Sequence, residues 1–354
     1  MKCGFYWGSA GLDMDKTNPY GPLLARAMEK IGVELVAAHV EDLSRDWLDA
    51  HRDTLDVLHI HWPHYTYTRP GLDESVANCT ALMEHLWYAR HLGYKVVWTV
   101  HNLYPHESIH PDLDRIARMA ISEIASALIV HCEYGRALVE RRFSRTEGVF
   151  TIPHGNFIEA YPNEISQAEA RKPLGLSDEH FVYLFFGNVR PYKGVDQLLE
   201  TFTEMSGDHL RLVLVAKLNT DYSKEIVEKA EAGDSRIVVR TSEFFPSEDF
   251  QIYLNAADVV VLPFQKILTS GSVMTAFSFG KPVVVPRIGC LTELVRNRVG
   301  VAYESKAAGA LKQAMVGVQD LDLEQCSEQA MKLAKSISWD RIAKNTAEVY
   351  QYQG

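Results

Sequence analysis

The chain has 354 residues, of which 47% are apolar and 23% are charged, as is typical of a globular protein with two domains. Its formal net charge of −10 argues against a general nucleic-acid-binding protein, which would carry a basic surface. The first residues lack the pattern of a secretory leader, and no stretch approaches ~20 uninterrupted apolar residues, so we expect a cytoplasmic protein without a membrane-spanning helix.

Short apolar runs recur along the first half of the chain, at residues 2–7, 33–39, 56–62, 95–100, 127–131 and 149–152. The runs are rich in β-branched residues and nearly continuous, as is typical of strands that are buried on both faces. Longer stretches between them, such as 21–32 and 81–93, predict helices. Strands that alternate with helices predict an α/β domain with a parallel sheet and right-handed crossovers.

The second half repeats this alternation, with apolar runs at residues 181–187, 211–216, 236–240, 258–263 and 282–286. Helical stretches at 195–205 and 247–257 separate some of these runs. The polar segment 157–180 contains two prolines and is interpreted as the linker between two domains. A last stretch, 338–353, has the pattern of an amphipathic helix.

The loop that follows the first predicted strand contains Gly8, Gly11 and Gly21. Glycines allow the backbone of such a loop to approach a bound sugar or phosphate closely. Gly11 and Asp13 are therefore candidates for contact with a ligand. No GxGxxG pattern is present, so a dinucleotide-binding fingerprint is not supported.

Histidines gather near the ends of two predicted strands of the first half: His59, His61, His64, His101 and His106. His59 and His61 would share one face of a strand, as two zinc ligands would. No cysteine or carboxylate stands at the spacing of a defined zinc site, so we expect no metal. Hydrogen bonding to a ligand and hydrogen bonding within the core remain as alternatives.

A turn with two cations follows the run 181–187. Gly187 allows the backbone to turn, and Arg190 and Lys193 come next at the carboxyl end of the predicted strand. An arginine can hold two phosphate oxygens at once, and a lysine acts as a point charge. This turn is a candidate anion site, with a solvated turn as the alternative.

A second candidate anion site is formed by Thr269, Ser270, Gly271 and Ser272, which precede a helical segment. A helix start exposes unpaired backbone N–H groups and the positive end of the helix dipole, and so binds phosphate. Ordinary capping by serine or threonine is the alternative. Two anion sites in neighbouring strand–helix units indicate a diphosphate, such as that of a nucleoside-diphosphate sugar.

Several motifs together resemble one known family: GNVRPYKG (187–194), AFSFGKPVVVP (276–286) and LTELV (291–295), with weaker matches in TVHN (99–102) and IPHGN (152–156). They resemble the retaining GT-B glycosyltransferases of family 4, the glycosyl transferases group 1. The resemblance implies two Rossmann-like domains that face a central cleft. It also implies an acceptor-binding domain, a donor-binding domain and a last helix that crosses back to the first domain; we expect these at 1–160, 161–336 and 337–354, respectively.

The resemblance also implies roles for individual residues. Arg190, Lys193 and His101 are the expected catalytic residues, and Gly187 with Thr269–Ser272 is expected to bind the donor diphosphate. Weaker candidates for the donor sugar or nucleotide are His154, Glu293 and Thr275. The expected activity is that of a metal-independent hexosyltransferase without a cofactor, which moves a sugar from a nucleotide sugar to a glycan or lipid-linked acceptor, with retention, in surface-polysaccharide synthesis.

The sequence departs from the family at two positions. Most members have two glutamates with the spacing E-x7-E, and these positions are Ile267 and Thr275 here. The loss of these glutamates favours a non-catalytic protein that binds nucleotide sugars as the alternative. A nucleotide-sugar epimerase and an inverting transferase with Asp13, His101 or Glu107 as its base are further alternatives, and the missing glutamates count against the epimerase.

A basic run at 135–148 contains Arg136, Arg141, Arg142 and Arg145. A solvated helix face is the ordinary interpretation of such a run. Contact with anionic lipid headgroups, and hence peripheral association with the inner membrane surface, is the alternative.

Overall fold

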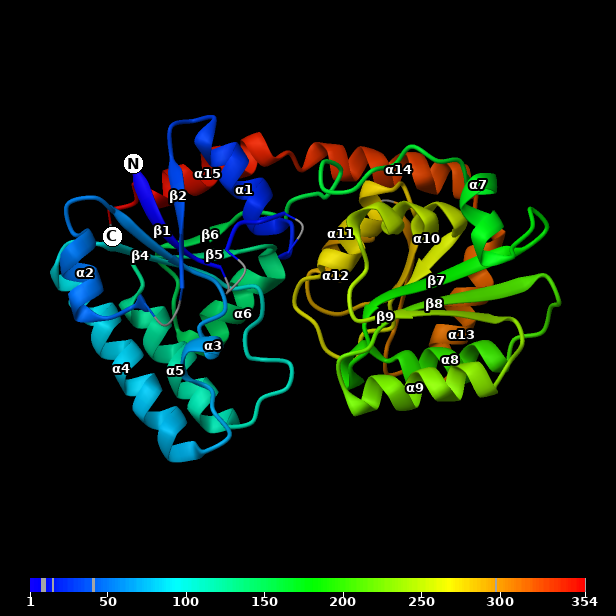
Figure 1. Ribbon diagram of the computed structural model, residues 1–354, viewed down its shortest axis with the longest axis horizontal. Helices are drawn as coiled ribbons and strands as arrows, with labels where there is room; N and C mark the ends of the chain where they lie inside the picture. Colours follow the sequence, from blue (N-terminus) through cyan, green and yellow to red (C-terminus); the bar gives the residue numbers. More distant parts are fainter. Residues whose placement is uncertain (8–10, 15, 40–41, 297, 354) are drawn as a thin grey trace. The chain divides into compact units, whose positions relative to one another are not determined.

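The computed structural model describes residues 1–7, 11–14, 16–39, 42–296 and 298–353. The chain forms two compact units: unit 1 comprises Met1–Gly155 and Ser338–Gly354, and unit 2 comprises Asn156–Ile337. Each unit contains one six-stranded parallel sheet with helices on both faces (Figure 1). The expected α/β class with two Rossmann-like domains is confirmed.

The sheet of unit 1 has the order β2-β1-β3-β4-β5-β6. Its strands are β1 (Lys2–Tyr6), β2 (Glu34–Ala38), β3 (Val57–Ile60), β4 (Lys95–Thr99), β5 (Ala127–Val130) and β6 (Val149–Thr151). Every strand lies within one of the apolar runs. All residues of β3 and β5 are buried, which explains why their sequences do not alternate between polar and apolar.

The helices of unit 1 are α1 (Tyr20–Glu29), α2 (Arg45–His51), α3 (His64–Tyr67), α4 (Leu72–His91), α5 (Pro111–Ile124), α6 (Glu133–Phe143) and α15 (Trp339–Tyr350). Helices α2, α4, α5 and α6 cover one face of the sheet, and α1 and α15 cover the other (Figure 1). The stretch 81–93 predicted only the second half of α4. Its first half, LDESVANCT, buries only Ser75 and Cys79, so it lacks a clear apolar pattern.

Helix α15 is part of unit 1 although 182 residues of unit 2 precede it in the chain. The Tyr350 hydroxyl lies 2.8 Å from Nδ1 of His59, a buried residue of β3. Lys30, which directly follows α1, forms an ion pair of 3.1 Å with Asp340, and Lys95 of β4 donates to the carbonyl of Tyr352. These contacts join α15 to strands and helices made from the first hundred residues.

The sheet of unit 2 has the order β12-β11-β10-β7-β8-β9. Its strands are β7 (Phe181–Asn188), β8 (Leu210–Lys217), β9 (Ile237–Ser242), β10 (Val259–Val261), β11 (Val283–Pro286) and β12 (Gly300–Tyr303). The sequence did not predict β12. It is a short edge strand, GVAY, and only Tyr303 of its four residues is buried.

The helices of unit 2 are α7 (Gln167–Arg171), α8 (Val195–Thr203), α9 (Asp221–Ala232), α10 (Phe250–Ala256), α11 (Gly271–Ser278), α12 (Leu291–Leu294), α13 (Ala310–Gly317) and α14 (Leu323–Ser336). The boundaries between the units lie at 155/156 and 337/338, close to the expected 160/161 and 336/337. The expected linker, 157–180, belongs to unit 2 and contains α7.

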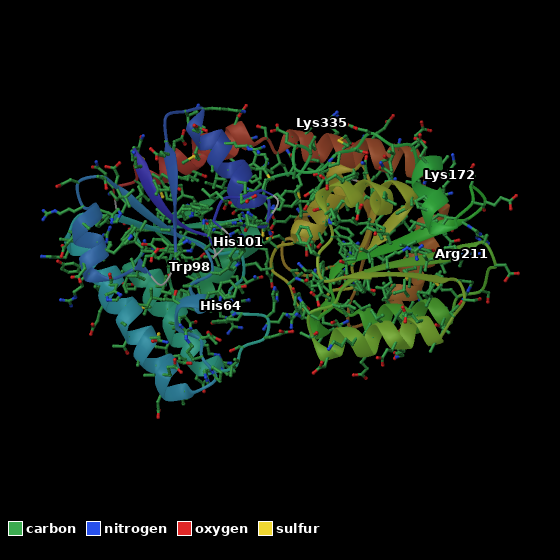
Figure 2. All side chains as sticks on the ribbon, viewed as in Figure 1. His64, Trp98, His101, Lys172, Arg211 and Lys335 are labelled. Atoms are coloured by element: carbon green, nitrogen blue, oxygen red, sulfur yellow. The ribbon has the colours of Figure 1, made fainter. Side chains whose placement is uncertain are left out.

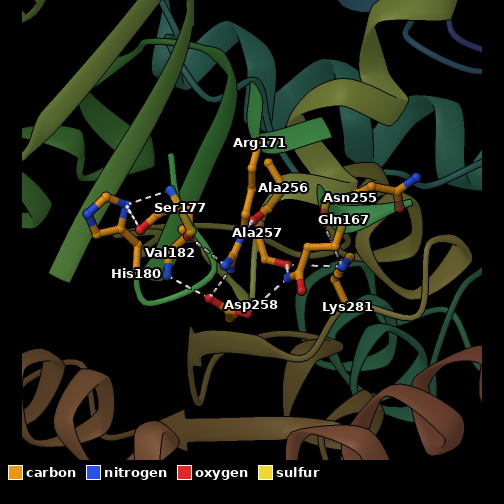
Figure 3. A network of polar contacts seen from close by, with 10 residues as sticks. All are labelled: Gln167, Arg171, Ser177, His180, Val182, Asn255, Ala256, Ala257, Asp258 and Lys281. Carbon is orange, nitrogen blue, oxygen red and sulfur yellow. Dashed lines mark hydrogen bonds and ion pairs between the residues drawn. The ribbon is translucent and has the colours of Figure 1, made fainter. Parts of the chain in front are cut away.

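A buried ion pair anchors α7 to the amino end of β10 (Figure 3). Arg171 is 3% exposed, and its Nη2 lies 2.9 Å from Oδ2 of Asp258. The other guanidinium nitrogens donate to the carbonyls of Ala256 and Ser177, and Asp258 also accepts from the backbone N–H of Val182 at 2.7 Å. This network lies at the amino-terminal edge of the sheet, the edge opposite to the one where open α/β sheets bind ligands.

Candidate functional site

The strand order of unit 2 indicates which edge of its sheet is expected to bind ligands. The first strand, β7, has β8 on one side and β10 on the other, so the chain changes direction across the sheet between β7 and β10. In open parallel sheets a crevice forms outside the carboxyl ends of the strands at this point. The loops that follow β7 and β10 contain the two predicted anion sites.

Two glycines shape the loop after β7. Gly187 has a φ of +119° and Gly194 a φ of +67°, both in a region that favours glycine. A Cβ atom at Gly194 would lie 2.2 Å from the carbonyl oxygen of Pro263, so only glycine allows the two loops to touch. Between the glycines, Arg190 is half-buried and extended, and a turn of 3₁₀ helix at Pro191–Lys193 follows it.

Lys193 is a buried cation at the point where the two loops meet. Its side chain is 8% exposed, and its Nζ lies 5.2 Å from the ring centre of Phe264, which follows β10. Among the described residues, no carboxylate and no hydrogen-bond acceptor contacts this Nζ. Burial lowers the pKa of Lys193 to about 8. A buried ammonium group that faces aromatic rings and lacks an anion is suited to an anionic ligand.

The lowered pKa of Lys193 predicts how anion binding depends on pH. Only the protonated form attracts a diphosphate, so affinity is full below about pH 8 and falls by up to ~10-fold per pH unit above it. Calorimetric titration with UDP and GDP between about pH 6.5 and about pH 9.5 measures this decline. An arginine stays charged throughout this range, so Lys193→Arg should abolish the decline. The same decline in the arginine variant would show that another group is responsible.

The second predicted anion site begins helix α11. Ser270 is 3% exposed and caps the helix, because its hydroxyl accepts from the N–H of Val273 at 3.2 Å. Within the described part of the chain, the backbone N–H groups of Gly271 and Ser272 have no acceptor. Capping and anion binding are therefore compatible here, since the cap occupies one N–H group and leaves two others.

The weaker candidates of unit 2 lie around this helix start. Thr275 is 4% exposed, and its hydroxyl donates to the carbonyl of Gly271 within α11. Cys290 donates its N–H to the carbonyl of Leu268 at 2.8 Å and so holds α12 against the loop. Glu293 is a half-buried residue of α12, and Thr269 is half-buried beside Ser270.

In unit 1, buried histidines form a chain of hydrogen bonds. His61 Nδ1 lies 2.9 Å from His101 Nε2, and His101 Nδ1 lies 3.1 Å from His131 Nε2. His131 Nδ1 lies 2.9 Å from the carbonyl oxygen of Ile152. Figure 2 labels His101 together with Trp98, whose indole N–H donates to the carbonyl of His61 at 3.3 Å. Both ring nitrogens of His101 are therefore occupied by neighbouring histidines.

Burial keeps these rings neutral. It lowers the pKa of His131 to about 3 and that of His154 to about 4, and it holds the pKa values of His61 and His101 well below the ordinary value. His154 donates from Nδ1 to the carbonyl of Gly155 at 2.9 Å, so Nδ1 is its protonated nitrogen. Among the described residues, no group of three or more histidine, cysteine or acidic side chains is arranged to hold a metal ion.

Sequence reasoning missed His131. It follows β5 directly, and His101 lies two residues after the end of β4, so its place after a buried strand was an available signal. His59, by contrast, is a core residue: both of its ring nitrogens are bonded, to Tyr350 and to Thr99.

The glycine-containing loop after β1 is only partly described. Gly11 has a φ of +62°, and Asp13 forms an ion pair of 2.9 Å with Lys16. Gly8 lies outside the described residues. At Gly21 a Cβ atom would lie 2.6 Å from the indole of Trp7, so this glycine permits a contact within the protein.

Two of the four arginines in the basic run bind backbone carbonyls. Arg136 donates to Val149, and Arg145 donates to Ser122, Ala125 and Glu147, which includes the last carbonyls of α5. Arg141 and Arg142 are exposed. Throughout the described ranges, no helix is both long enough and apolar enough to cross a membrane.

Comparison with known proteins identifies relatives of both units. The family model for "Glycosyl transferases group 1" matches residues 180–320. A GDP-mannose:glycolipid 4-beta-D-mannosyltransferase of Xanthomonas campestris pv. campestris is 29% identical over 240 residues, which are 65% of this chain and 61% of that protein. The chain thus aligns with about three fifths of this relative's length.

Two solved structures have the same fold over almost the whole chain. Sucrose-phosphate synthase from Thermosynechococcus elongatus superimposes with a TM-score of 0.75 at 16% identity, covering 99% of this chain and 98% of that one. Anabaena Alr3699/HepE, solved in complex with UDP-glucose, superimposes with a TM-score of 0.74 at 17% identity, covering 99% of each chain. At these identities the likeness shows a shared fold.

Proposed function

We propose that the chain is a member of the glycosyl transferases group 1, whose family model matches residues 180–320, and that it uses its GT-B fold to transfer a sugar from a nucleoside-diphosphate sugar to a hydroxyl group of a glycan or lipid-linked acceptor. The observation that carries this proposal is Lys193, a buried ammonium group without an anion at the carboxyl edge of the sheet. The nucleoside-diphosphate group is the anion that the related mannosyltransferase and the UDP-glucose complex both suggest.

The mechanism follows from the charge that develops on the leaving diphosphate. As the bond between the sugar and the diphosphate breaks, negative charge grows on the diphosphate, and fixed positive groups lower the energy of that transition state. Lys193 and Arg190 supply formal charge, and the N–H groups of Gly271 and Ser272 supply oriented dipoles. His101 is the candidate of unit 1, and because both of its ring nitrogens are bonded to His61 and His131, it would act through these two neighbours.

We expect the reaction to retain the configuration at the anomeric carbon. A double displacement needs a carboxylate nucleophile, and residues 264–280 contain no acidic side chain. A front-face route needs no such group, because the leaving diphosphate can take the proton of the acceptor hydroxyl. NMR of the first-formed product, compared with the donor, measures the outcome. An inverted product would instead assign the chemistry to a base of unit 1, with Asp13, His101 and Glu107 as candidates.

Native mass spectrometry tests the proposal directly. The full chain should bind a member of a panel that includes GDP-mannose and UDP-glucose, and binding should persist in EDTA, since we propose that neither a metal nor another cofactor takes part. Lys193→Met should lose the complex. Failure of the whole panel to bind the unaltered protein would refute the proposal, and loss of binding in EDTA would refute metal independence.

A non-catalytic nucleotide-sugar-binding protein is the second candidate. Ile267 and Thr275 favour it, because they stand where most family members have glutamates, and the Thr275 hydroxyl is already bonded within α11. Slow hydrolysis of the donor without any acceptor distinguishes the two candidates, since only an enzyme weakens the sugar–diphosphate bond.

We further propose a role in surface-polysaccharide synthesis at the cytoplasmic side of the membrane, in line with the glycolipid acceptor of the related mannosyltransferase.

A further inference from the structure

The histidine chain of unit 1 has a direction that its geometry determines. The carbonyl oxygen of Ile152 can only accept, so the His131 nitrogen beside it, Nδ1, carries a proton. In a neutral ring, Nε2 of His131 is then an acceptor, and His101 must donate to it from Nδ1. His101 Nε2 is in turn an acceptor, so His61 donates to it from Nδ1.

This direction leaves one atom with a lone pair and no donor. His61 Nε2 is buried, and none of the described residues provides a hydrogen-bond partner for it. The ring is 1% exposed and lies among aromatic rings, 4.5 Å from Phe5 and 4.8 Å from Trp7 between ring centres. Buried polar atoms in native proteins are nearly always paired, so an unpaired acceptor at the end of an ordered chain indicates a missing donor.

We propose that His131 is a positioning residue that sets the direction of this chain, and that His61 Nε2 accepts a hydrogen bond from a hydroxyl group of a bound saccharide. The inference rests on the proposed function, because it specifies the group that unit 1 receives from a sugar substrate. A hydroxyl of the donor sugar and a hydroxyl of the acceptor share this chemistry.

The chemistry of His61 Nε2 favours a ligand group that is uncharged and donates a hydrogen bond. A lone pair on a neutral imidazole repels phosphate and carboxylate oxygens, which are themselves acceptors. Burial keeps His61 and its two partners neutral over the ordinary pH range, so they do not become cationic and attract an anion. The rings of Trp7, Tyr20 and Trp62 lie against the histidine chain: Trp7 is 4.8 Å from His61, and Tyr20 and Trp62 are 5.2 Å and 5.0 Å from His101 between ring centres. Aromatic rings beside a few polar groups are typical of sites that bind small molecules.

The direction of the chain can be measured in the free protein. Long-range ¹H–¹⁵N correlation spectra of the full chain, labelled at histidine, separate protonated from bare ring nitrogens. We expect a protonated Nδ1 and a bare Nε2 in His61, His101 and His131 alike. A protonated Nε2 at His61 would overturn the proposal, because this atom could no longer accept.

Two variants test whether His131 sets this direction. His131→Gln keeps an acceptor oxygen for the His101 N–H, so the tautomers of His61 and His101 should be unchanged. His131→Leu removes that acceptor, so both rings should lose their single tautomer. Unchanged tautomers in a folded leucine variant would show that His131 has only a structural role.

A titration then tests the hydroxyl contact. The probes are GDP-mannose and UDP-glucose for the donor sugar, methyl glucoside and methyl mannoside for the acceptor, and GDP and UDP as controls without a sugar. The His61 Nε2 signal should move with one class of sugar-containing probe and stay unchanged with GDP and UDP. His61→Leu should weaken that binding about tenfold, and His61→Gln, which keeps an acceptor, should restore most of it.

The outcomes separate this inference from the proposed function. If sugar nucleotides bind in a manner that depends on Lys193 while no probe moves the His61 signal, the hydroxyl contact is wrong and the proposed function stands. If none of the probes binds at all, both proposals fail.

Discussion

Lys193→Met should lower the rate of sugar transfer about 10²–10³-fold, the typical cost of losing one group that stabilises charge in a transition state. Methionine has a similar length and fills the same space against Phe264, so the packing of the two loops should survive. The variant should be no less stable than the unaltered protein in the absence of ligand. Burial desolvates the ammonium group of Lys193, which is unfavourable, and no anionic partner among the described residues offsets this. Steady-state kinetics and urea unfolding measure the two effects.

Lys281 provides a matched control in the same unit. It is half-buried and its pKa is likewise lowered to about 8 by desolvation, but its Nζ donates to the carbonyl of Ala257 at 2.9 Å, at the amino-terminal edge of the sheet. Lys281→Met should therefore lower stability and leave the affinity for nucleotide sugar unchanged. Equal losses of transfer rate in the two variants would show that the effect of Lys193 comes from the fold and not from an anion site.

Asp258→Ala should lower the free energy of unfolding of unit 2 by about 3–5 kcal/mol, because it leaves the buried guanidinium of Arg171 without its counter-charge. The N–H of Val182 loses its carboxylate acceptor in the same variant. Urea unfolding followed by circular dichroism measures the loss. Affinity for nucleotide sugar at low temperature should persist, since Asp258 lies where β10 begins, at the edge of the sheet opposite to the predicted anion sites.

An exposed pair of the same unit serves as the comparison. Lys229 Nζ lies 2.8 Å from Glu200 Oε1, with side chains that are 51% and 65% exposed. Breaking it with Glu200→Ala should cost no more than about 1 kcal/mol, because water screens and replaces such a contact. Equal costs for the buried and the exposed pair would contradict the role assigned to burial.

The fold was largely predictable because its strands are buried on both faces. Eleven strands coincide with apolar runs, and the exception is β12, where three of four residues are only partly buried. Strand β12 is short, begins with a glycine and has one buried residue, so its sequence carries little signal, whereas β9 was marked by the β-branched run at 236–240 although none of its residues is fully buried. The first half of α4 was not predicted because it buries only Ser75 and Cys79 and so lacks a clear apolar pattern.

The candidate site was less predictable from the sequence, because several of its side chains contact residues that are far away along the chain. Lys193 stood out by its place after a strand, but its aromatic neighbour Phe264 is 71 residues away, and only the fold brings them together. Likewise, nothing in the sequence shows that His101 lies between two other histidines. Arg145 belongs to an ordinary basic run in the sequence, whereas in the fold it binds the carbonyls of Ser122 and Ala125 at the end of α5.

Unit 1 is formed by two segments of the chain that are separated by unit 2, and this arrangement affects biosynthesis. A ribosome that has made residue 337 has produced all of unit 2, whereas unit 1 still lacks α15 and the hydroxyl of Tyr350 that bonds to His59 in its core. Unit 1 is thus begun before unit 2 and completed after it, and the face of its sheet that α15 covers stays open while unit 2 is translated. A nascent chain in this state offers a binding surface for chaperones until residues 338–354 have emerged.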